Sequence, residues 1–211
     1  LMYLCTSTRP DIVYAVHYLC RCLTRPTPAL MNETDHVIAY LARHRDVGLT
    51  YSHEESGLRG FSDASWETEY STSGWVTFYK SAALTWGSSK QPSIALSSCE
   101  AEIIALSEAA KDMVYLRRLV EGIEPGSIKG PSKLATDNQG ARDTAYNPVG
   151  HKRLKHVERR HYFIRDQVED LVLKVPFVRT ADNWADFFTK ALPPKKFFAM
   201  RKFIMNEPDK A

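Results

Sequence analysis

Three strand-like segments lie close together in this chain, and one long helical pattern follows them. The segments cover residues 58–63, 74–79 and 83–86. Their connections are short and contain turn residues, which favours an antiparallel meander. The helical pattern runs over residues 99–121. Ser97 and Ser98 can cap its start, and Gly122 can end it. This order predicts a sheet with at least one helix packed against it.

Two further strands and three further helices are expected in the second half of the chain. They are a strand at 132–137, a short helix from Asn138, a basic helix at about 155–170, a strand at 171–178, and a last helix from about Asp182 past Pro193 and Pro194. The complete order is β-β-β-α-β-α-α-β-α. It predicts an α/β fold with a mixed five-stranded sheet and helices on both faces.

The first fifty-odd residues have a helical pattern. Asp11 can cap a helix that carries Ile12 and Leu19, and a second helix is expected from Pro28 to His44. Neither segment holds a cluster of catalytic side chains. We therefore expect small helices that pack on a neighbouring element.

Composition excludes several classes of protein. Of 211 residues, 44% are hydrophobic, which is enough for a packed core and excludes general disorder. The net charge of +3 is too small to indicate a nucleic-acid binder by itself. Four cysteines without C-x-x-C spacing argue against a zinc ribbon or a disulfide scaffold. Neither a secretion signal nor a membrane-spanning run is evident, so we expect an intracellular protein.

Acidic residues end two of the expected strands. Asp63 closes the first strand, and Asp137 closes the strand at 132–137 just before a helix begins. Functional groups gather at the carboxyl ends of strands in open α/β sheets, so these two acids can lie side by side. The alternative is that each acid only forms a turn or caps a helix.

Glu102 extends the apolar stripe of the long helix. Steps of three or four residues from Glu102 meet Ala105, Ala109, Met113, Leu116 and Val120. Glu100 instead shares a mixed and mostly polar face, which we expect to be wet. A carboxylate on a buried stripe is costly unless a cation compensates it. The alternative is that Glu102 only favours the positive end of the helix dipole.

Asp186 is the fourth candidate, in the first turn of the expected last helix. A cap or dipole role competes there, with Asp182 as a plausible cap. Taken together, the four acids are typical of the oxygen ligands of a hard cation such as Mg²⁺. Two such ions can hydrolyse a phosphodiester without a nucleophilic side chain.

The motifs around these acids, in this order, resemble the ribonuclease H domain of copia-type LTR retrotransposon Pol polyproteins. They are Phe61–Trp66, Ser71–Gly74, Trp86–Gln91, Ala95–Glu102, Asp137–Gln139, Lys155–His156, Asp182–Asp186 and Thr189–Pro193. The leader resembles the tail of the preceding reverse transcriptase through Leu1–Leu4, Thr8–Ile12 and Gly48–Tyr51.

This resemblance implies a ribonuclease H-like three-layer fold with strand order 3-2-1-4-5. It implies a helical reverse transcriptase tail at 1–56, a ribonuclease H-like domain at 57–206 and a tail at 207–211. Asp63, Glu102, Asp137 and Asp186 become the catalytic and metal-ligating residues, with two Mg²⁺ ions or Mn²⁺ as cofactor. The implied activity is hydrolysis of the RNA strand of RNA–DNA hybrids. The implied partners are the hybrid and the reverse transcriptase portion of the same polyprotein, and the implied location is a cytoplasmic virus-like particle with some exposure to the nucleus.

Four features depart from the family pattern: the shortened segment between Trp66 and Ser71, and the residues Cys99, Tyr162 and Trp184. They leave open a catalytically degenerate module that binds nucleic acid or packs on the polymerase. A DNA-strand transferase of the same architecture is a further alternative.

Substrate contacts are expected from a basic stretch at 151–165. Its candidate nucleic-acid-binding residues are Lys152, Arg153, Lys155, His156, Arg159 and Arg160. A solvated basic helix is the alternative. Ser65, Asn138 and Gln139 are candidate partners for RNA 2′-hydroxyls. We expect Trp66, Trp75 and Trp86 to fill the packed faces of the sheet.

Overall fold

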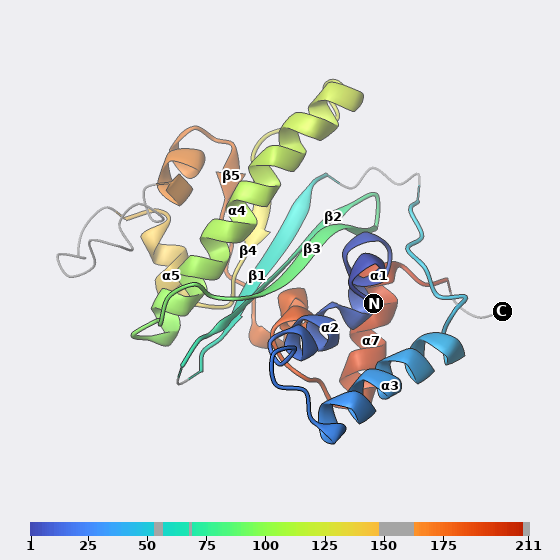
Figure 1. The fold of residues 1–211 in the computed structure, drawn as a ribbon. Coiled ribbons are helices and arrows are strands. Elements are labelled where there is room, and N and C mark those ends of the chain that lie inside the picture. The colour runs from blue at the N-terminus through green and yellow to red at the C-terminus, as the bar shows by residue number, and fades with distance from the viewer. Residues whose placement is uncertain (53–56, 68, 148–162, 209–211) are drawn as a thin grey trace.

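The computed structural model describes residues 1–52, 57–67, 69–147 and 163–208 (Figure 1). Its centre is a five-stranded sheet of order β3-β2-β1-β4-β5, which confirms the predicted strand order. The strands are β1 (Arg59–Ser65), β2 (Thr72–Tyr79), β3 (Ala82–Lys90), β4 (Ser132–Ala135) and β5 (Leu173–Lys174). The first three form the expected antiparallel meander, while β4 runs parallel to β1 and β5 runs parallel to β4.

One face of the sheet is covered by the long helix α4 (Ser98–Ile123). The Ser97 side chain accepts a hydrogen bond from the backbone N–H of Glu100, which caps the helix as expected. Met113 and Leu116 of α4 pack with Leu134 and Leu173 of the parallel strands. The predicted stop at Gly122 is wrong, because the helix continues through that residue to Ile123.

The opposite face is covered by the N-terminal helices together with α7 (Pro194–Met205). These helices are α1 (Met2–Ser7), η1 (Pro10–Ile12), α2 (Val13–Cys20) and α3 (Pro28–Arg43). Val13 and Val16 share a buried cluster with Val76, Phe78 and other core residues. Trp75 and Tyr79 alternate with these β2 residues and pack on the α4 side. Figure 1 shows α1, α2, α3 and α7 together, away from α4. The chain therefore has three layers.

A buried polar network ties the N-terminal helices to α7. Arg9 forms an ion pair with Asp11 at 2.7 Å, and the Tyr40 hydroxyl donates to Asp11 at 2.6 Å. Arg201 of α7 donates to the same hydroxyl at 2.9 Å. The expected helix cap at Asp11 is wrong, because its carboxylate is engaged by these side chains and caps nothing.

The last third of the chain differs most from the expected elements. The predicted strand at 171–178 reduces to β5 and one isolated bridge between Thr136 and Phe177. The predicted single last helix is wrong. It is three pieces: η2 (Thr180–Asp182), η3 (Trp184–Phe188) and α7. The short helix after Asn138 is α5 (Gln139–Thr144). Of the expected basic helix, residues 163–169 are helical and residues 155–162 lie outside the described residues.

No helix in the described part of the chain is long and apolar enough to cross a membrane.

The shared cluster predicts that the N-terminal segment stabilises the sheet. Val13→Ala should lower the free energy of unfolding by about 2 kcal/mol, because it removes buried methyl groups and leaves a cavity. Leu23→Ala is the matched control, since Leu23 is 72% exposed, and it should cost less than about 0.5 kcal/mol. Urea unfolding followed by tryptophan fluorescence measures both variants. Equal, negligible effects would show that the sheet does not depend on this segment.

Candidate metal centre

Three acids from three elements meet where β1 and β4 end. Asp63 lies on β1, Glu102 lies near the start of α4, and Asp137 follows β4 by two residues. One carboxylate oxygen from each lies within 4.8 Å of the others. The parallel pairing of β1 with β4 brings Asp63 and Asp137 to the same edge, as strand ends predict. The cap at Ser97 sets the start of α4 and so places Glu102 over that edge. We call these residues the acidic triad.

The acidic triad is largely removed from solvent. Asp63 is 3% exposed and Glu102 is 7% exposed, whereas Asp137 is partly exposed. Glu102 Oε1 accepts a hydrogen bond from the Ala64 N–H at 3.3 Å. Glu102 Oε2 is buried and has no hydrogen-bond partner among the described residues. Such an orphaned oxygen is costly in a protein interior. Carboxylate oxygens that converge on one point are the donors that Mg²⁺ prefers, so these residues fit a divalent cation.

In the metal-free protein, burial and mutual repulsion disfavour the charged form of the carboxyl groups of Asp63 and Glu102. Burial raises the pKa of Asp63 to about 6, although the Thr189 hydroxyl and Lys190 favour its charged form. Burial raises the pKa of Glu102 to about 9, with help from the charges of Asp63 and Asp137. The protein therefore supplies too little positive charge to balance this site.

Asp186 lies beside the triad, but two lysines neutralise it. It is on the 3₁₀ helix η3 and is 1% exposed. Lys190 Nζ lies 2.5 Å from Asp186 Oδ1, and Lys196 Nζ lies 2.6 Å from Asp186 Oδ2. Lys190 Nζ also lies 3.8 Å from Asp63 Oδ2. Burial disfavours the Lys190 ammonium, but these ion pairs outweigh it and raise its pKa. The structure thus gathers three of the four predicted acids and links the fourth to them through Lys190.

Asn183 holds Asp137 in place. Its side-chain N–H groups donate to Asp137 Oδ1 and to the Ser62 carbonyl, both at 3.0 Å. Its Oδ1 accepts the N–H of Ala185 and caps η3. The predicted cap at Asp182 is wrong for this helix, because the neighbouring Asn183 takes that role. Asn183 was not predicted as a site residue, although it lies inside the Asp182–Asp186 motif.

Thr189 holds the Asp63 carboxylate in place, and Gly74 leaves space for the Thr189 side chain. The Thr189 hydroxyl donates to Asp63 Oδ2 in a short hydrogen bond. Gly74 pairs with Asp63 across β1 and β2. A Cβ at Gly74 would lie 2.5 Å from Thr189 Cγ2 and 2.9 Å from Phe188 Cβ. Thr189, Lys190 and Lys196 were missed by sequence reasoning. Thr189 and Lys190 open the Thr189–Pro193 motif, which was the available signal for those two.

Glu100 is buried, contrary to the expectation of a wet face. It is 9% exposed, and Ile103 and Ser107 on the same face are buried as well. Its Oε2 accepts the Leu96 N–H at 2.8 Å, beside the Ser97 cap. Glu100 thus completes the hydrogen bonding at the helix start, and it is not part of the acidic triad.

The predicted substrate contacts are placed in part. Ser65 is half-buried at the end of β1, while Asn138 caps α5 by accepting the Ala141 N–H at 2.9 Å. Gln139 is exposed and donates to Asp143 at 3.3 Å. The six basic candidates lie outside the described residues. These are Lys152, Arg153, Lys155, His156, Arg159 and Arg160.

Two of the four departures from the family pattern are packed side chains. Trp184 stacks on Phe203 with ring centroids 3.8 Å apart. Cys99 packs against Ile103 and Ala141, and Tyr162 lies outside the described residues. The packed position expected for Trp66 is wrong. It is 55% exposed, and its indole N–H donates to the Ala95 carbonyl. Trp75 and Trp86 pack against the two core clusters as expected.

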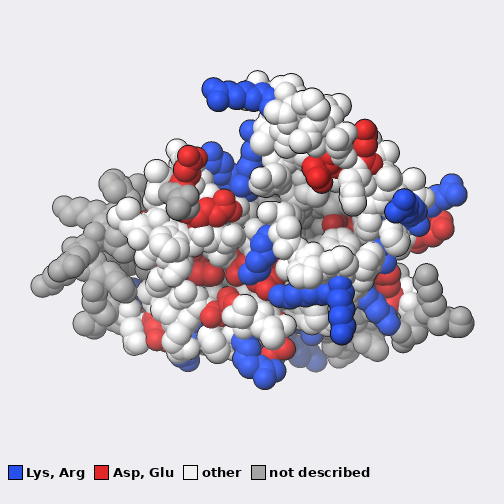
Figure 2. All heavy atoms as spheres, turned by 90° about the horizontal axis from the view of Figure 1, so that it is seen from below, with Lys and Arg blue, Asp and Glu red and all other residues white. Residues whose placement is uncertain are grey.

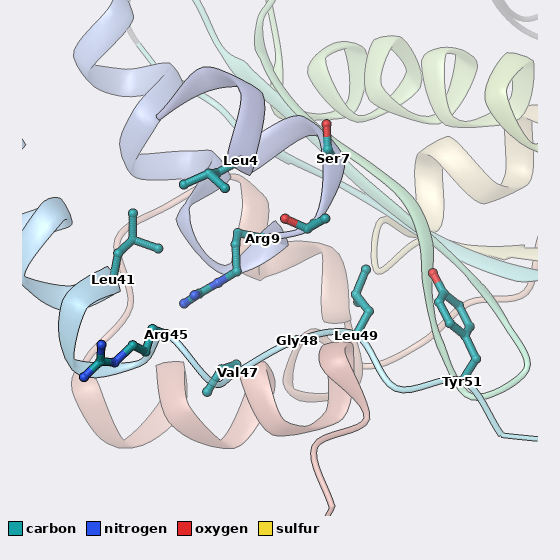
Figure 3. A pocket seen from close by; sticks show the side chains of 10 residues that line it. Leu4, Ser7, Arg9, Leu41, Arg45, Val47, Gly48, Leu49 and Tyr51 are labelled. Atoms are coloured by element: carbon teal, nitrogen blue, oxygen red, sulfur yellow. The ribbon is translucent and has the colours of Figure 1, made fainter.

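A pocket of about 620 Å³ lies apart from the acids, between α1, the end of α3 and the segment that follows it (Figure 3). Leu4, Leu41, Val47 and Leu49 make much of its wall apolar, and Arg9 extends into it. Its lining holds no carboxylate, so it cannot replace the acidic triad as a metal centre.

Figure 2 views the molecule from below Figure 1, from the end at which β1 finishes. Acidic and basic side chains lie next to one another near the middle of that face.

Gly74→Ala should destabilise the protein by about 1–3 kcal/mol, because the new methyl group overlaps Thr189 and Phe188. The displaced hydroxyl should also release Asp63. Gly122→Ala is the matched control, since nothing lies within 4 Å of its added Cβ and alanine favours a helix. Denaturant midpoints measure both changes. A Gly74→Ala protein as stable as Gly122→Ala would contradict the close packing.

The pH dependence of stability tests the buried charge. The pKa of Glu102 is raised from its ordinary 4.5 to about 9. Its contribution to metal-free stability is therefore fully present below about pH 4.5 and is lost as pH rises through 9. Between pH 5 and 9 in EDTA, wild type should lose at least about 2 kcal/mol more unfolding free energy than Glu102→Gln. Parallel pH profiles would show that Glu102 is already compensated.

Comparisons with known proteins place this geometry in a family. No protein-family model matches the chain. It is 32% identical over 208 residues to the retrovirus-related Pol polyprotein from transposon TNT 1-94 of Nicotiana tabacum, and 34% identical over 199 residues to that from transposon RE2 of Arabidopsis thaliana. These matches cover 97% and 91% of the chain, but only 16% and 13% of the relatives.

A solved structure of LC11-RNase H1, isolated from compost by a metagenomic approach, has the same fold. The match has a TM-score of 0.50 at 14% identity and covers 63% of this chain and 92% of that one. The strand order and this likeness confirm a ribonuclease H-like fold. The chain is a homologue of the retrovirus-related Pol polyproteins of copia-type transposons, and its own fold is ribonuclease H-like.

Proposed function

We propose that this chain is a metal-dependent endonuclease that hydrolyses the RNA strand of RNA–DNA hybrids during reverse transcription of a copia-type retrotransposon. The single observation that carries the proposal is the acidic triad, with an unpartnered buried oxygen on Glu102. The ribonuclease H-like fold and the Pol polyprotein relatives support a role of this class.

Asp63, Glu102 and Asp137 are the proposed ligands of the catalytic cations, and Asp186 is the fourth acid of the proposed site. Bound Mg²⁺, as two ions, or Mn²⁺ would supply positive charge that favours attack of water on the phosphodiester and departure of the 3′-oxygen. Asn183 fixes the direction of the Asp137 carboxylate, and Thr189 fixes that of Asp63. Because these donors are fixed in advance, the site needs little rearrangement when charge develops in the transition state.

Substrate binding is assigned to two groups of residues. The basic candidates from Lys152 to Arg160 would contact phosphates, since Lys and Arg side chains neutralise the charge of a nucleic-acid backbone. Ser65, Asn138 and Gln139 would contact RNA 2′-hydroxyls near the acids. We also propose that 1–56 is the reverse transcriptase tail, 57–206 the ribonuclease H-like domain and 207–211 a tail. The partner is the reverse transcriptase portion of the polyprotein, within a cytoplasmic virus-like particle.

Glu102→Gln and Glu100→Gln form a matched pair that tests this function. Both change one buried carboxylate on the same helix, but only Glu102 belongs to the acidic triad. With Mg²⁺ and an end-labelled hybrid, wild type should cut the RNA strand. Glu102→Gln should lose at least about 100-fold in rate, as expected for a lost ligand. Glu100→Gln should stay within about threefold, because glutamine still accepts the Leu96 N–H.

Three outcomes would contradict the proposal. Wild type as inert as Glu102→Gln would indicate a degenerate binding module. Cleavage of both DNA and RNA strands would contradict the RNA specificity and leave the strand-transferase alternative open. Undiminished cleavage in EDTA would exclude the metal-dependent reaction.

A further inference from the structure

Lys190 stands between two acids of the proposed metal centre. Its ammonium lies 2.5 Å from Asp186 Oδ1 and 3.8 Å from Asp63 Oδ2. Both carboxylates are nearly fully buried. The ammonium of Lys190 therefore lies near two carboxylates that are far apart in the sequence.

The two sides of the site differ in how their charge is balanced. On the Asp186 side, Lys190 and Lys196 each contact one carboxylate oxygen. Glu102 Oε2 and Asp186 Oδ1 are both buried without a hydrogen bond among the described residues, but of the two only Asp186 Oδ1 has an ion pair there, with Lys190. A free divalent cation thus meets unbalanced charge at the acidic triad and balanced charge at Asp186. Binding between Asp63 and Asp186 would bring a divalent cation against an ammonium of the same sign.

The Lys190 side chain can move away from the two carboxylates. It is 42% exposed, so the ammonium can reach solvent by rotation of its flexible stem. The cost of leaving is the loss of its contacts with Asp186 and Asp63. A cation that takes its place must offset that loss, and this lowers the apparent affinity of the cation.

We propose that Lys190 is a built-in counter-cation that neutralises the Asp63–Asp186 side of the site and competes with a second divalent cation there. The first cation binds at the acidic triad with Lys190 in place. The second binds only when Lys190 has moved to solvent. This inference rests on the proposed function, because it assumes that the acids hold divalent cations.

The experiment counts bound Mn²⁺ by isothermal titration and by electron paramagnetic resonance, without nucleic acid, at pH 8 and constant ionic strength. Wild type should bind one ion tightly and a second weakly. Lys190→Gln should tighten the second ion about tenfold or more and leave the first within about threefold. Lys190→Arg keeps the charge and should behave like wild type. Lys195→Gln removes the same charge from an exposed position on α7 and is the matched control.

Thermal unfolding in EDTA gives an independent readout of the same proposal. Lys190→Gln should unfold at a lower temperature than Lys195→Gln, because it leaves Asp63 and Asp186 less compensated. The proposal is overturned if the second-ion affinity of Lys190→Gln equals that of Lys195→Gln, or if the variant binds the second ion more weakly than wild type. In either case the proposed metal centre still stands if wild type binds one ion and Asp63→Asn does not bind it. If wild type binds no ion, both proposals fail.

Discussion

The main physical constraint on this chain is that three carboxylates converge at a site that is largely removed from solvent. Asp63 and Glu102 are almost fully buried, and the converging oxygens of the triad repel one another. Glu102 Oε2 is buried and finds no hydrogen-bond partner in the described part of the chain, which costs stability. Asn183 holds the Asp137 carboxylate and Thr189 holds that of Asp63, and the resulting arrangement is compatible with a bound divalent cation. Functional sites commonly keep such a local cost because the rest of the fold is stable enough to bear it.

The rest of the fold provides that support from both faces of the sheet. Helix α4 presents Glu102 near its start, and further along it Met113 and Leu116 share a buried cluster with residues of β4 and β5. On the other face, α7 and η3 pack against β2 together with residues near the N-terminus. The Arg9–Asp11–Tyr40–Arg201 network fixes those layers to one another. The N-terminal helices, which we propose as the reverse transcriptase tail, therefore pack as one structural layer against the sheet.

Sequence reasoning located the parts of the site that follow from local periodicity. The 3.6-residue stripe marked Glu102, although the wet face expected for Glu100 is buried, and the ends of two strands marked Asp63 and Asp137. It failed where long-range contacts decide the structure. Asp186 was expected on an α-helix, but Asn183 starts a 3₁₀ turn there because its side chain is drawn to Asp137 and Ser62. Likewise, β5 is two residues long since only those residues pair with β4. Lys190 and Lys196 gain their role from spatial neighbours that no periodicity predicts, and the exposed Trp66 was misjudged because aromatic residues are usually packed.

The central claim is that the acidic triad is incomplete without a divalent cation, and thermal unfolding with and without Mg²⁺ at pH 8 tests it most directly. A ligand that binds only the native state stabilises it by about 2.7 kcal/mol at a hundredfold excess over its dissociation constant. Wild type should therefore unfold several degrees higher in Mg²⁺ than in EDTA, and Asp63→Asn should show little of that shift. Identical unfolding temperatures for wild type in the two conditions would contradict the account.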